Sequence, residues 1–306
     1  MTHPPTCHEL ALVGLDGSNP LAFLATLGVL RGLILGQRDD GLQLHFAPGT
    51  GTAVLRGPLS LDRTTLPGLL AGVLRDLAKP DSIAGFGDVI GVPQAVYAAF
   101  VTAGLTHAAV SPNTPESAGA LFAASYACSV VVDSKKLVVT PTRLSFTNGQ
   151  GGKNLLKDFR TLAACVTADQ IATSLFDPWS YSDEDQPTFR WDPADLRPYA
   201  HMATDPGTTS TRSVMGANAL AFLGLSFFPV VPTSAGLATT GVTGSRNDEA
   251  LTWPLWSHPC TADLVASILH TDLPPADQAT MGVFVHYRAR RMVVNKGVYF
   301  APSTAV

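Results

Sequence analysis

Charged residues are scarce in this chain of 306 residues: Asp, Glu, Lys and Arg make up 14% of it, against about 25% in typical soluble proteins. The 20 Lys plus Arg and 24 Asp plus Glu give a formal net charge of −4. The lack of a positive excess argues against a protein that coats nucleic acid by itself. The 46% hydrophobic content excludes a disordered chain and predicts a large core. A surface so poor in charge also favours cover by partner subunits.

The sequence also lacks the features of exported, membrane-spanning and metal-binding chains. Residues 1–7 contain no basic region followed by an apolar run, so we expect no secretory signal. The most apolar stretch, residues 21–35, is shorter than the roughly 20 residues of a membrane span and contains Arg31. The cysteines and histidines show no metal-ligand spacing; the cysteines are Cys7, Cys128, Cys165 and Cys260. We therefore expect a cytoplasmic protein with no membrane segment, metal or cofactor.

Hydrophobic periodicity and turn residues predict an α+β protein of mixed helices and antiparallel sheet. The first strand is expected over residues 10–15, and Ser18 or Asn19 can cap a helix that begins at Pro20. Helices are further expected over residues 62–77, 92–105, 116–126, 153–166, 167–176, 213–228 and 260–270. Strands are expected over 42–46, 52–56, 129–132, 136–140, 237–242, 251–253, 281–291 and 293–300. The three helical glycines predicted to pack closely are Gly28, Gly216 and Gly224.

The chain divides into two regions by composition. Residues 1–126 form a mostly helical region that opens with the strand and helix, and residues 127–306 form an α+β region with basic hairpins. The second region also contains an acidic, aromatic segment over 177–199, too aromatic for a disordered linker, which we expect to pack across the body. The two regions are either one large domain or two closely packed ones.

A glycine-rich loop between a strand and a helix is the first candidate site. Its candidate contacts are Gly149, Gly151, Gly152 and Lys153. Glycines let backbone N–H groups approach a phosphate, and the following helix start favours an anion. Lys157 and Arg160 continue the site along one helical face. The P-loop pattern fails, since Thr147 and Asn154 replace its first Gly and its Ser or Thr. The alternative is a long turn with solvated lysines.

A basic stretch near the C-terminus is the second candidate. Residues 286–296 carry Arg288, Arg290, Arg291 and Lys296 and no acid. In a strand, Arg288 and Arg290 share one face, and Arg291 lies on the other. Such a strand beside an aromatic residue suits a groove that follows a nucleic-acid backbone. Solvated edge-strand charges that deter aggregation are the alternative.

Catalytic patterns are weak, and we identify no catalytic residue. Ser18, Ser134 and Ser213 lack the Gly-x-Ser-x-Gly context of a nucleophile elbow. The acids of the aromatic segment are better suited to pair with a basic patch on this chain or on a neighbour; they are Asp183, Glu184, Asp185, Asp192 and Asp195. The pattern therefore leans away from an enzyme.

Three segments carry a resemblance to a known family. Residues 15–31, LDGSNPLAFLATLGVLR, resemble the opening of CRISPR-associated proteins of the type I-U (I-G) group. The segment FRWDP at 189–193, followed by Asp195, Arg197, Tyr199 and Ala200, is also similar to these proteins. So is the pattern GANxLA at 216–221 with Leu225 and the following Phe227–Pro229. The likeness covers about half of the chain. Large-subunit members are often longer, so the chain resembles a short variant.

The resemblance implies a non-catalytic large subunit of a Cascade-type, RNA-guided interference complex in antiviral defence. Its expected partners are other CRISPR-associated subunits, CRISPR RNA and target DNA, with sequence read by the guide RNA. The expected DNA-backbone contacts are the candidate residues of the loop and of the basic stretch. The net acidity of the chain departs from what a free DNA-binding protein would show.

Two other functions stay open at this level. An enzyme could bind a phosphorylated small molecule through Gly149–Lys153, which would require an acid or base that converges on the loop. A purely structural assembly protein would have no contact with nucleic acid. An open basic groove without a catalytic group would favour nucleic acid over the enzyme.

Overall fold

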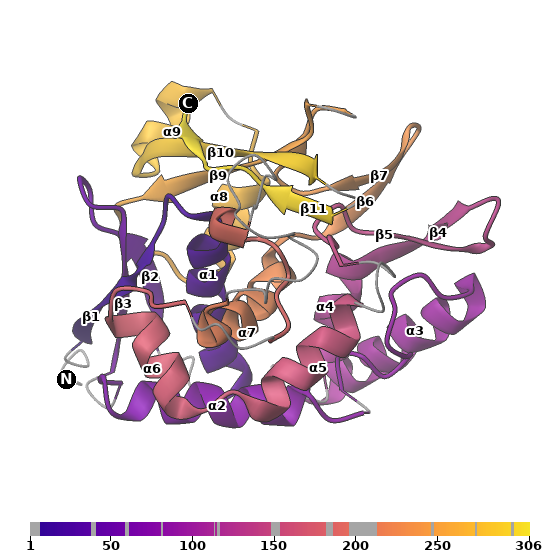
Figure 1. The fold of residues 1–306 in the computed structure, drawn as a ribbon, viewed down its shortest axis with the longest axis horizontal. Coiled ribbons are helices and arrows are strands. Elements are labelled where there is room, and N and C mark those ends of the chain that lie inside the picture. The colour runs from indigo at the N-terminus through magenta and orange to yellow at the C-terminus, as the bar shows by residue number, and fades with distance from the viewer. Residues whose placement is uncertain are drawn as a thin grey trace, which may run out of the picture.

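The computed structural model describes residues 7–37, 41–58, 61–80, 82–112, 114, 117–147, 154–181, 186–195, 213–245, 248–272, 274–294 and 297–306. Helices and antiparallel strands are mixed in these residues (Figure 1), which confirms the α+β class. The helices are α1 (Pro20–Leu35), α2 (Thr65–Leu77), α3 (Gln94–Val110), α4 (Ala118–Tyr126), α5 (Leu155–Cys165), α6 (Ala168–Phe176), α7 (Met215–Gly224), α8 (Ala262–His270) and α9 (Pro275–Thr280), with 3₁₀ turns η2 (Pro193–Asp195) and η4 (Leu225–Phe227). The strands are β1 (Cys7–Asp16), β2 (Gln43–Phe46), β3 (Thr52–Pro58), β4 (Ala127–Asp133), β5 (Val138–Pro141), β6 (Val230–Thr233), β7 (Gly236–Thr239), β8 (Val242–Thr243), β9 (Ala250–Trp256), β10 (Val283–Val294), β11 (Gly297–Phe300) and β12 (Thr304–Ala305).

Helix α1 lies at the centre of the molecule (Figure 1) and is buried along its length. Asn19 caps it, accepting hydrogen bonds from the N–H groups of Leu21 at 2.8 Å and Ala22 at 3.2 Å, and Pro20 takes the first position as predicted. Every residue of α1 except Arg31 is buried. Burial on all sides explains why α1 is apolar around its whole circumference.

Helix α7 is the main partner of α1, and all ten of its residues are buried. The two backbones touch: a Cβ on Gly28 would collide with the carbonyl of Leu220, and a Cβ on Gly224 with that of Leu24. Only glycine permits so close an approach, so the predicted close packing at Gly28 and Gly224 is confirmed. Gly216 packs in the same way against α6, where a Cβ would lie 2.6 Å from the carbonyl oxygen of Gln170.

Two antiparallel sheets flank the central helices. One has the order β1-β3-β2, in which the strands expected over 42–46 and 52–56 pair in the register Gln43↔Arg56 to Phe46↔Ala53. The other is built on β10, which pairs with β9 on one edge and with β11 and β12 on the other. Phe23, Phe46, Trp253 and Trp256 stack between the sheets and α1, with ring centroids 5.1–6.4 Å apart. These contacts join the two sheets through one core.

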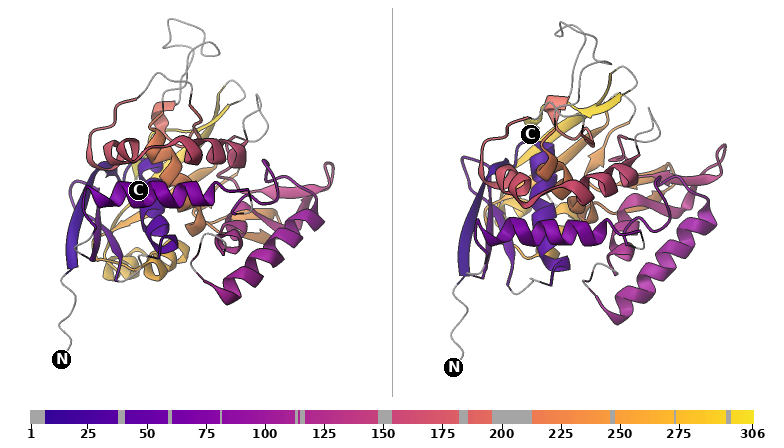
Figure 2. Two further views of the ribbon diagram at one scale, coloured as in Figure 1. Left: turned by 90° about the horizontal axis from the view of Figure 1, so that it is seen from below. Right: turned by 60° about the horizontal axis from the view of Figure 1, so that its bottom comes forward.

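The α3–α4 pair and the β4–β5 hairpin form the periphery (right side of Figures 1 and 2). The hairpin was predicted, and it turns over residues 134–137 with Asp133 paired to Val138. The predicted division of the chain at residues 126 and 127 falls between α4 and β4. Whether the parts on either side are separate domains stays a prediction; α1 and α7, one from each, pack together in a continuous core.

The structure corrects several predicted boundaries. The helix expected over residues 213–228 starts at Met215 and gives way to a 3₁₀ turn at Leu225. The strand expected over 237–242 is broken between β7 and β8, where Gly241 has a φ of 72°. In the aromatic segment, Phe189 and Trp191 are fully buried, which confirms that it packs onto the body. Its residues Asp183, Glu184 and Asp185 lie outside the described residues.

Candidate nucleic-acid interface

Strand β10 presents Arg288 and Arg290 on one face, as predicted from alternation. Nη2 of Arg288 lies 3.2 Å from Oδ1 of Asp248, and Nε of Arg290 lies 3.9 Å from the same oxygen. Asp248 also accepts a 3.2 Å hydrogen bond from Arg288 at its backbone oxygen. The Asp248 side chain is 70% exposed, so water screens both ion pairs and each contributes about 1 kcal/mol or less.

Arg291 lies on the opposite face of β10 and has a buried partner. Its Nη1 lies 2.9 Å from Oε2 of Glu249, whose side chain is only 8% exposed, and Nε of Arg143 lies 3.4 Å from Oε1. One buried carboxylate thus joins the residues before the glycine-rich loop to β10. The Arg291 guanidinium also lies 5.5 Å from the ring centroid of Phe146. Burial makes these contacts more resistant to salt than those of Asp248.

Arg190, from the aromatic segment, reaches the same edge of the sheet. Its guanidinium lies 5.1 Å from the ring centroid of Tyr299 in β11, and its backbone oxygen accepts a hydrogen bond from the N–H of Phe300 at 3.4 Å. Its φ of 62° is in the left-handed region, which costs a non-glycine residue about 1–3 kcal/mol. Its Nη1 is buried and has no hydrogen-bond partner among the described residues. Arg190 therefore adds a guanidinium that is only partly hydrogen-bonded within the described residues to the positive charge near β11.

These side chains form what we call the arginine cluster: Arg143, Arg190, Arg288, Arg290 and Arg291. The two carboxylates that pair with it, Asp248 and Glu249, leave the cluster with an excess of positive charge among the described residues. Tyr299 adds a partly exposed aromatic ring, whereas the ring of Phe146 is buried beneath Arg291. Basic groups interleaved with rings are the combination that binds a nucleic-acid backbone with its bases.

The base of the glycine-rich loop lies at this cluster. Phe146 packs against Phe300 of β11 with ring centroids 4.7 Å apart. The N–H of Leu155, at the start of α5, donates a 3.1 Å hydrogen bond to the carbonyl of Thr147. The two ends of the loop are therefore joined beside β11. The predicted contacts Gly149, Gly151, Gly152 and Lys153, and also Lys296, lie outside the described residues.

Lys157 and Arg160 lie on α5 and lead elsewhere. Arg160 forms an ion pair with Asp88 and donates a 3.4 Å hydrogen bond to the carbonyl of Ala84. Lys157 is exposed, and its backbone N–H donates to the carbonyl of Asp88 at 3.3 Å. Both residues contact the 84–88 segment, and these contacts do not join them to the arginine cluster. The structure thus brings together the predicted arginines of β10 and the loop base, while the contacts of Arg160 fix α5 to its neighbour.

A second polar centre joins the segments that carry the family resemblance. Asp192 accepts hydrogen bonds from the Asn19 amide at 3.2 Å, from the Tyr181 hydroxyl at 2.8 Å and from the N–H of Ala194 at 3.0 Å. Burial, with the Asp192 carboxylate beside it, raises the pKa of the Tyr181 hydroxyl well above its usual value. Because these bonds hold both carboxylate oxygens of Asp192 at the start of α1, the centre has a structural role.

Other classes of site find no support in the described residues. These residues hold no group of three or more His, Cys, Asp or Glu side chains placed to bind a metal ion. Within the same segments, none of the helices has the length and apolar character needed to cross a membrane. Comparison of the chain with models of protein families, with curated proteins and with solved structures finds no match.

Sequence reasoning missed two kinds of residue in this site. Asp248 and Glu249 were not recognised as the partners of β10, although an acidic pair directly before an apolar strand is a visible signal. Arg143 and Arg190 were not selected as contacts. No local pattern marks Arg190, because its left-handed backbone breaks the alternation between Phe189 and Trp191.

Proposed function

We propose that this chain is a non-catalytic subunit of a CRISPR RNA-guided interference complex in antiviral defence, and that it contacts the backbone of target DNA through the arginine cluster. The observation that carries the proposal is that β10 places Arg288 and Arg290 on one face. On its other face Arg291 lies with Arg143 and the base of the glycine-rich loop, and Arg190 and Tyr299 lie at the neighbouring β11. The proposal that the chain belongs to an assembly with an RNA guide is based on the family resemblance of residues 15–31 and 189–199.

The arrangement suits a backbone better than a base-reading role. Guanidinium groups bind phosphate oxygens in a two-pronged geometry, and aromatic rings stack on bases of any sequence. Sequence selection then falls to the guide RNA, as expected for this class of complex. A subunit of this kind needs positive charge only where DNA passes, which is compatible with the net charge of −4.

The carboxylates of the site explain why binding by the isolated chain should be weak. DNA has to displace Asp248 before Arg288 and Arg290 can reach phosphates, and the exposed Asp248 is held weakly enough for that exchange. Glu249 is buried between Arg143 and Arg291 and fixes them in place. We therefore assign Arg288 and Arg290 to phosphate contact, and Arg291 to positioning of the loop base through Phe146.

The first experiment tests the assembly. The affinity-tagged chain is purified from its own host, the co-purifying proteins are identified, and bound RNA is sequenced before and after nuclease treatment. We expect a set of CRISPR-associated subunits and a repeat-derived guide RNA. An enzyme of phosphorylated small molecules would purify without that RNA, and a purely structural protein would purify with subunits whose DNA affinity does not change when the cluster is mutated.

The second experiment tests the arginine cluster in the purified complex. The double variant Arg288→Ala/Arg290→Ala should weaken target-DNA binding and lower the salt dependence of log K by about 1 for each lost phosphate contact. Asp248→Asn should do the opposite and tighten binding several-fold, because it removes the competing carboxylate. The matched controls are Arg75→Ala on α2 and Asp277→Asn on α9, both exposed. Equal DNA affinity and salt slope in the double variant and in Arg75→Ala would refute the cluster assignment.

A further inference from the structure

Helix α3 is apolar but almost uncovered. Of its 17 residues only Tyr97 and Gly104 are buried, and no Asp, Glu, Lys or Arg occurs in Gln94–Val110. Leu105 is 59% exposed and Val110 is 81% exposed. The helix is about 25 Å long, so it presents an extended apolar surface of the kind that marks a protein-protein contact. Figure 2 shows α3 at the edge of the molecule, with α4 on one side only.

Two apolar hollows run along α3. One, of about 450 Å³, lies between α3 and the 82–86 segment and is lined by Phe86, Val96 and Phe100 among others. The other, of about 340 Å³, lies between the end of α3, the start of α4 and the end of α1. Its walls are Leu35, Leu105, Ala108, Pro112, Ala118, Ala120 and Leu121, and it also contains Ser117 and Arg31. The second hollow is therefore apolar apart from one hydroxyl and one guanidinium.

Among the described residues, the guanidinium of Arg31 has a hydroxyl and an aromatic ring as neighbours and no ion-pair partner. Its Nε donates a 2.9 Å hydrogen bond to Ser226 Oγ, and the guanidinium lies 4.5 Å from the ring centroid of Phe227. Burial lowers its pKa to about 10, and the carboxylate of Asp263 acts in the opposite direction. No ion pair among the described residues includes Arg31. A partly buried cation of this kind is stabilised by a nearby carboxylate.

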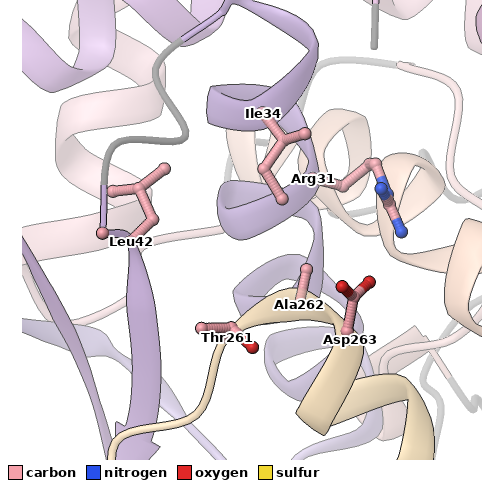
Figure 3. A pocket seen from close by; sticks show the side chains of 7 residues that line it. Arg31, Ile34, Leu42, Thr261, Ala262 and Asp263 are labelled. Atoms are coloured by element: carbon pink, nitrogen blue, oxygen red, sulfur yellow. The ribbon is translucent and has the colours of Figure 1, made fainter. Parts of the chain in front are cut away.

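Asp263 does not supply that carboxylate by direct contact. Figure 3 shows Arg31 and Asp263 at one side of a further cavity, of about 250 Å³, between α1 and the start of α8. Asp263 is exposed at the mouth of that cavity. Arg31 therefore lines two cavities, and on the α3 side the described lining contains no carboxylate.

We propose that the exposed face of α3, with Arg31 at the base of the adjoining hollow, docks an apolar segment of a partner protein that carries one carboxylate for Arg31. The inference rests on the proposed function only in taking the partner to be another subunit of the same assembly. Charge complementarity selects the occupant: an apolar chain fits α3, and a single carboxylate completes the Arg31 site. A lipid surface is a poorer match, because α3 has no Lys or Arg to hold headgroups.

Site-specific photo-crosslinking tests the occupant. A photoreactive phenylalanine analogue replaces Leu105 in the tagged chain, which is expressed in its own host, and Val13, exposed on β1, is the matched control position. We expect position 105, and not position 13, to crosslink to a different polypeptide at an apolar segment containing Asp or Glu. A crosslink to a second copy of the chain, to lipid, to a segment without an acid, or to nothing would overturn the proposal.

Variants then test the role of Arg31 in the same contact. Against a synthetic peptide of the crosslinked segment, Arg31→Met should weaken binding about 30-fold or more, and replacing the peptide carboxylate by an amide should add little to that loss. Leu105→Asp and Val110→Asp, both at exposed positions, should abolish binding without changing the thermal unfolding midpoint. Full binding by these two variants would contradict the proposal. So would losses of binding free energy from Arg31→Met and from the peptide amide that simply add.

Failure of this proposal is distinguishable from failure of the proposed function. An assembly that contains guide RNA, but in which position 105 forms no crosslink, would remove the docking face and leave the RNA-guided function. A crosslink to an acidic, apolar segment in an assembly without RNA would do the reverse.

Discussion

Helices α1 and α3 are close in length, with 16 and 17 residues, and both are mainly apolar, yet their surroundings are opposite. In α1 every residue but Arg31 is buried, because α7 and the two sheets surround it. In α3 two residues are buried, because the chain supplies cover on one side only. An apolar composition therefore predicts that a helix is covered by other residues. Only the structure shows whether those residues belong to the same chain.

The largest expected effect is at the contact of α1 with α7. In Gly28→Ala the added methyl group would overlap the Leu220 carbonyl, so the free energy of unfolding should fall by about 3 kcal/mol or more. Gly72→Ala on α2, where nothing lies within 4 Å of the added atom, is the control and should stabilise by about 0.5–1 kcal/mol. Denaturant titration measures both. Equal stability of the two variants would mean that the helices do not touch at Gly28.

The next effect is at the start of α1. Asn19→Ala removes the cap and the bond to Asp192, so the free energy of unfolding should fall by about 1–2 kcal/mol. Asn19→Ser keeps the cap and loses only the Asp192 bond, so its loss should be smaller. Chemical denaturation of the three proteins gives the ranking, and a serine variant as unstable as the alanine variant would show that the cap contributes nothing.

A smaller effect concerns pH and the sheets that cover α1. Burial lowers the pKa of His45 and of His286 below the usual 6.5, despite the opposing charge of Glu9 at His45. The unfolded chain then binds more protons than the folded one, so stability is full above about pH 6.5 and falls as the pH drops below it. The thermal midpoint should decrease between pH 7.5 and 5.5, and His45→Gln/His286→Gln should reduce that decrease. If the double variant showed the same decrease in thermal midpoint as the original protein, titratable groups other than His45 and His286 would be responsible for it.

The smallest effect is expected on α3 itself. Leu105→Gln and Val110→Gln should change the free energy of unfolding of the isolated chain by no more than about 0.5 kcal/mol, since both side chains are exposed. The same exchange at the buried Leu27 of α1 should cost about 3 kcal/mol or more. Thermal unfolding of the three variants checks the contrast. Strong destabilisation at position 105 would show that α3 is covered by its own chain.

Local signals predicted much of this fold. The cap and Pro20 start α1, the glycines at 28 and 224 mark its contact with α7, and turn residues place the hairpins; each depends on neighbours close in sequence or on one residue type. Boundaries failed where tertiary packing decided them: the helix expected to reach residue 228 ends at Gly224, and a turn at Gly241 interrupts a strand.

The candidate site was predictable only in part, because its partners are distant in sequence. Alternation placed Arg288 and Arg290 on one face, but the pairing with Asp248 depends on the register of β10 against β9. The shared use of Glu249 by Arg143 and Arg291 brings together three segments that no local pattern connects. The exposure of α3 could not be predicted from the sequence either, because an apolar helix can be covered by its own chain or by a partner.

The central position of α1 has a consequence during synthesis. Arg31 and its hydrogen-bond partner Ser226 are separated by 195 residues, which at about 5–20 residues per second take roughly 10–40 s to translate. Until α7 leaves the ribosome, α1 can pack against α2, but the face that α7 covers stays exposed as an apolar surface on the nascent chain. Production of this protein should therefore depend on translation speed and on chaperones that bind nascent apolar segments.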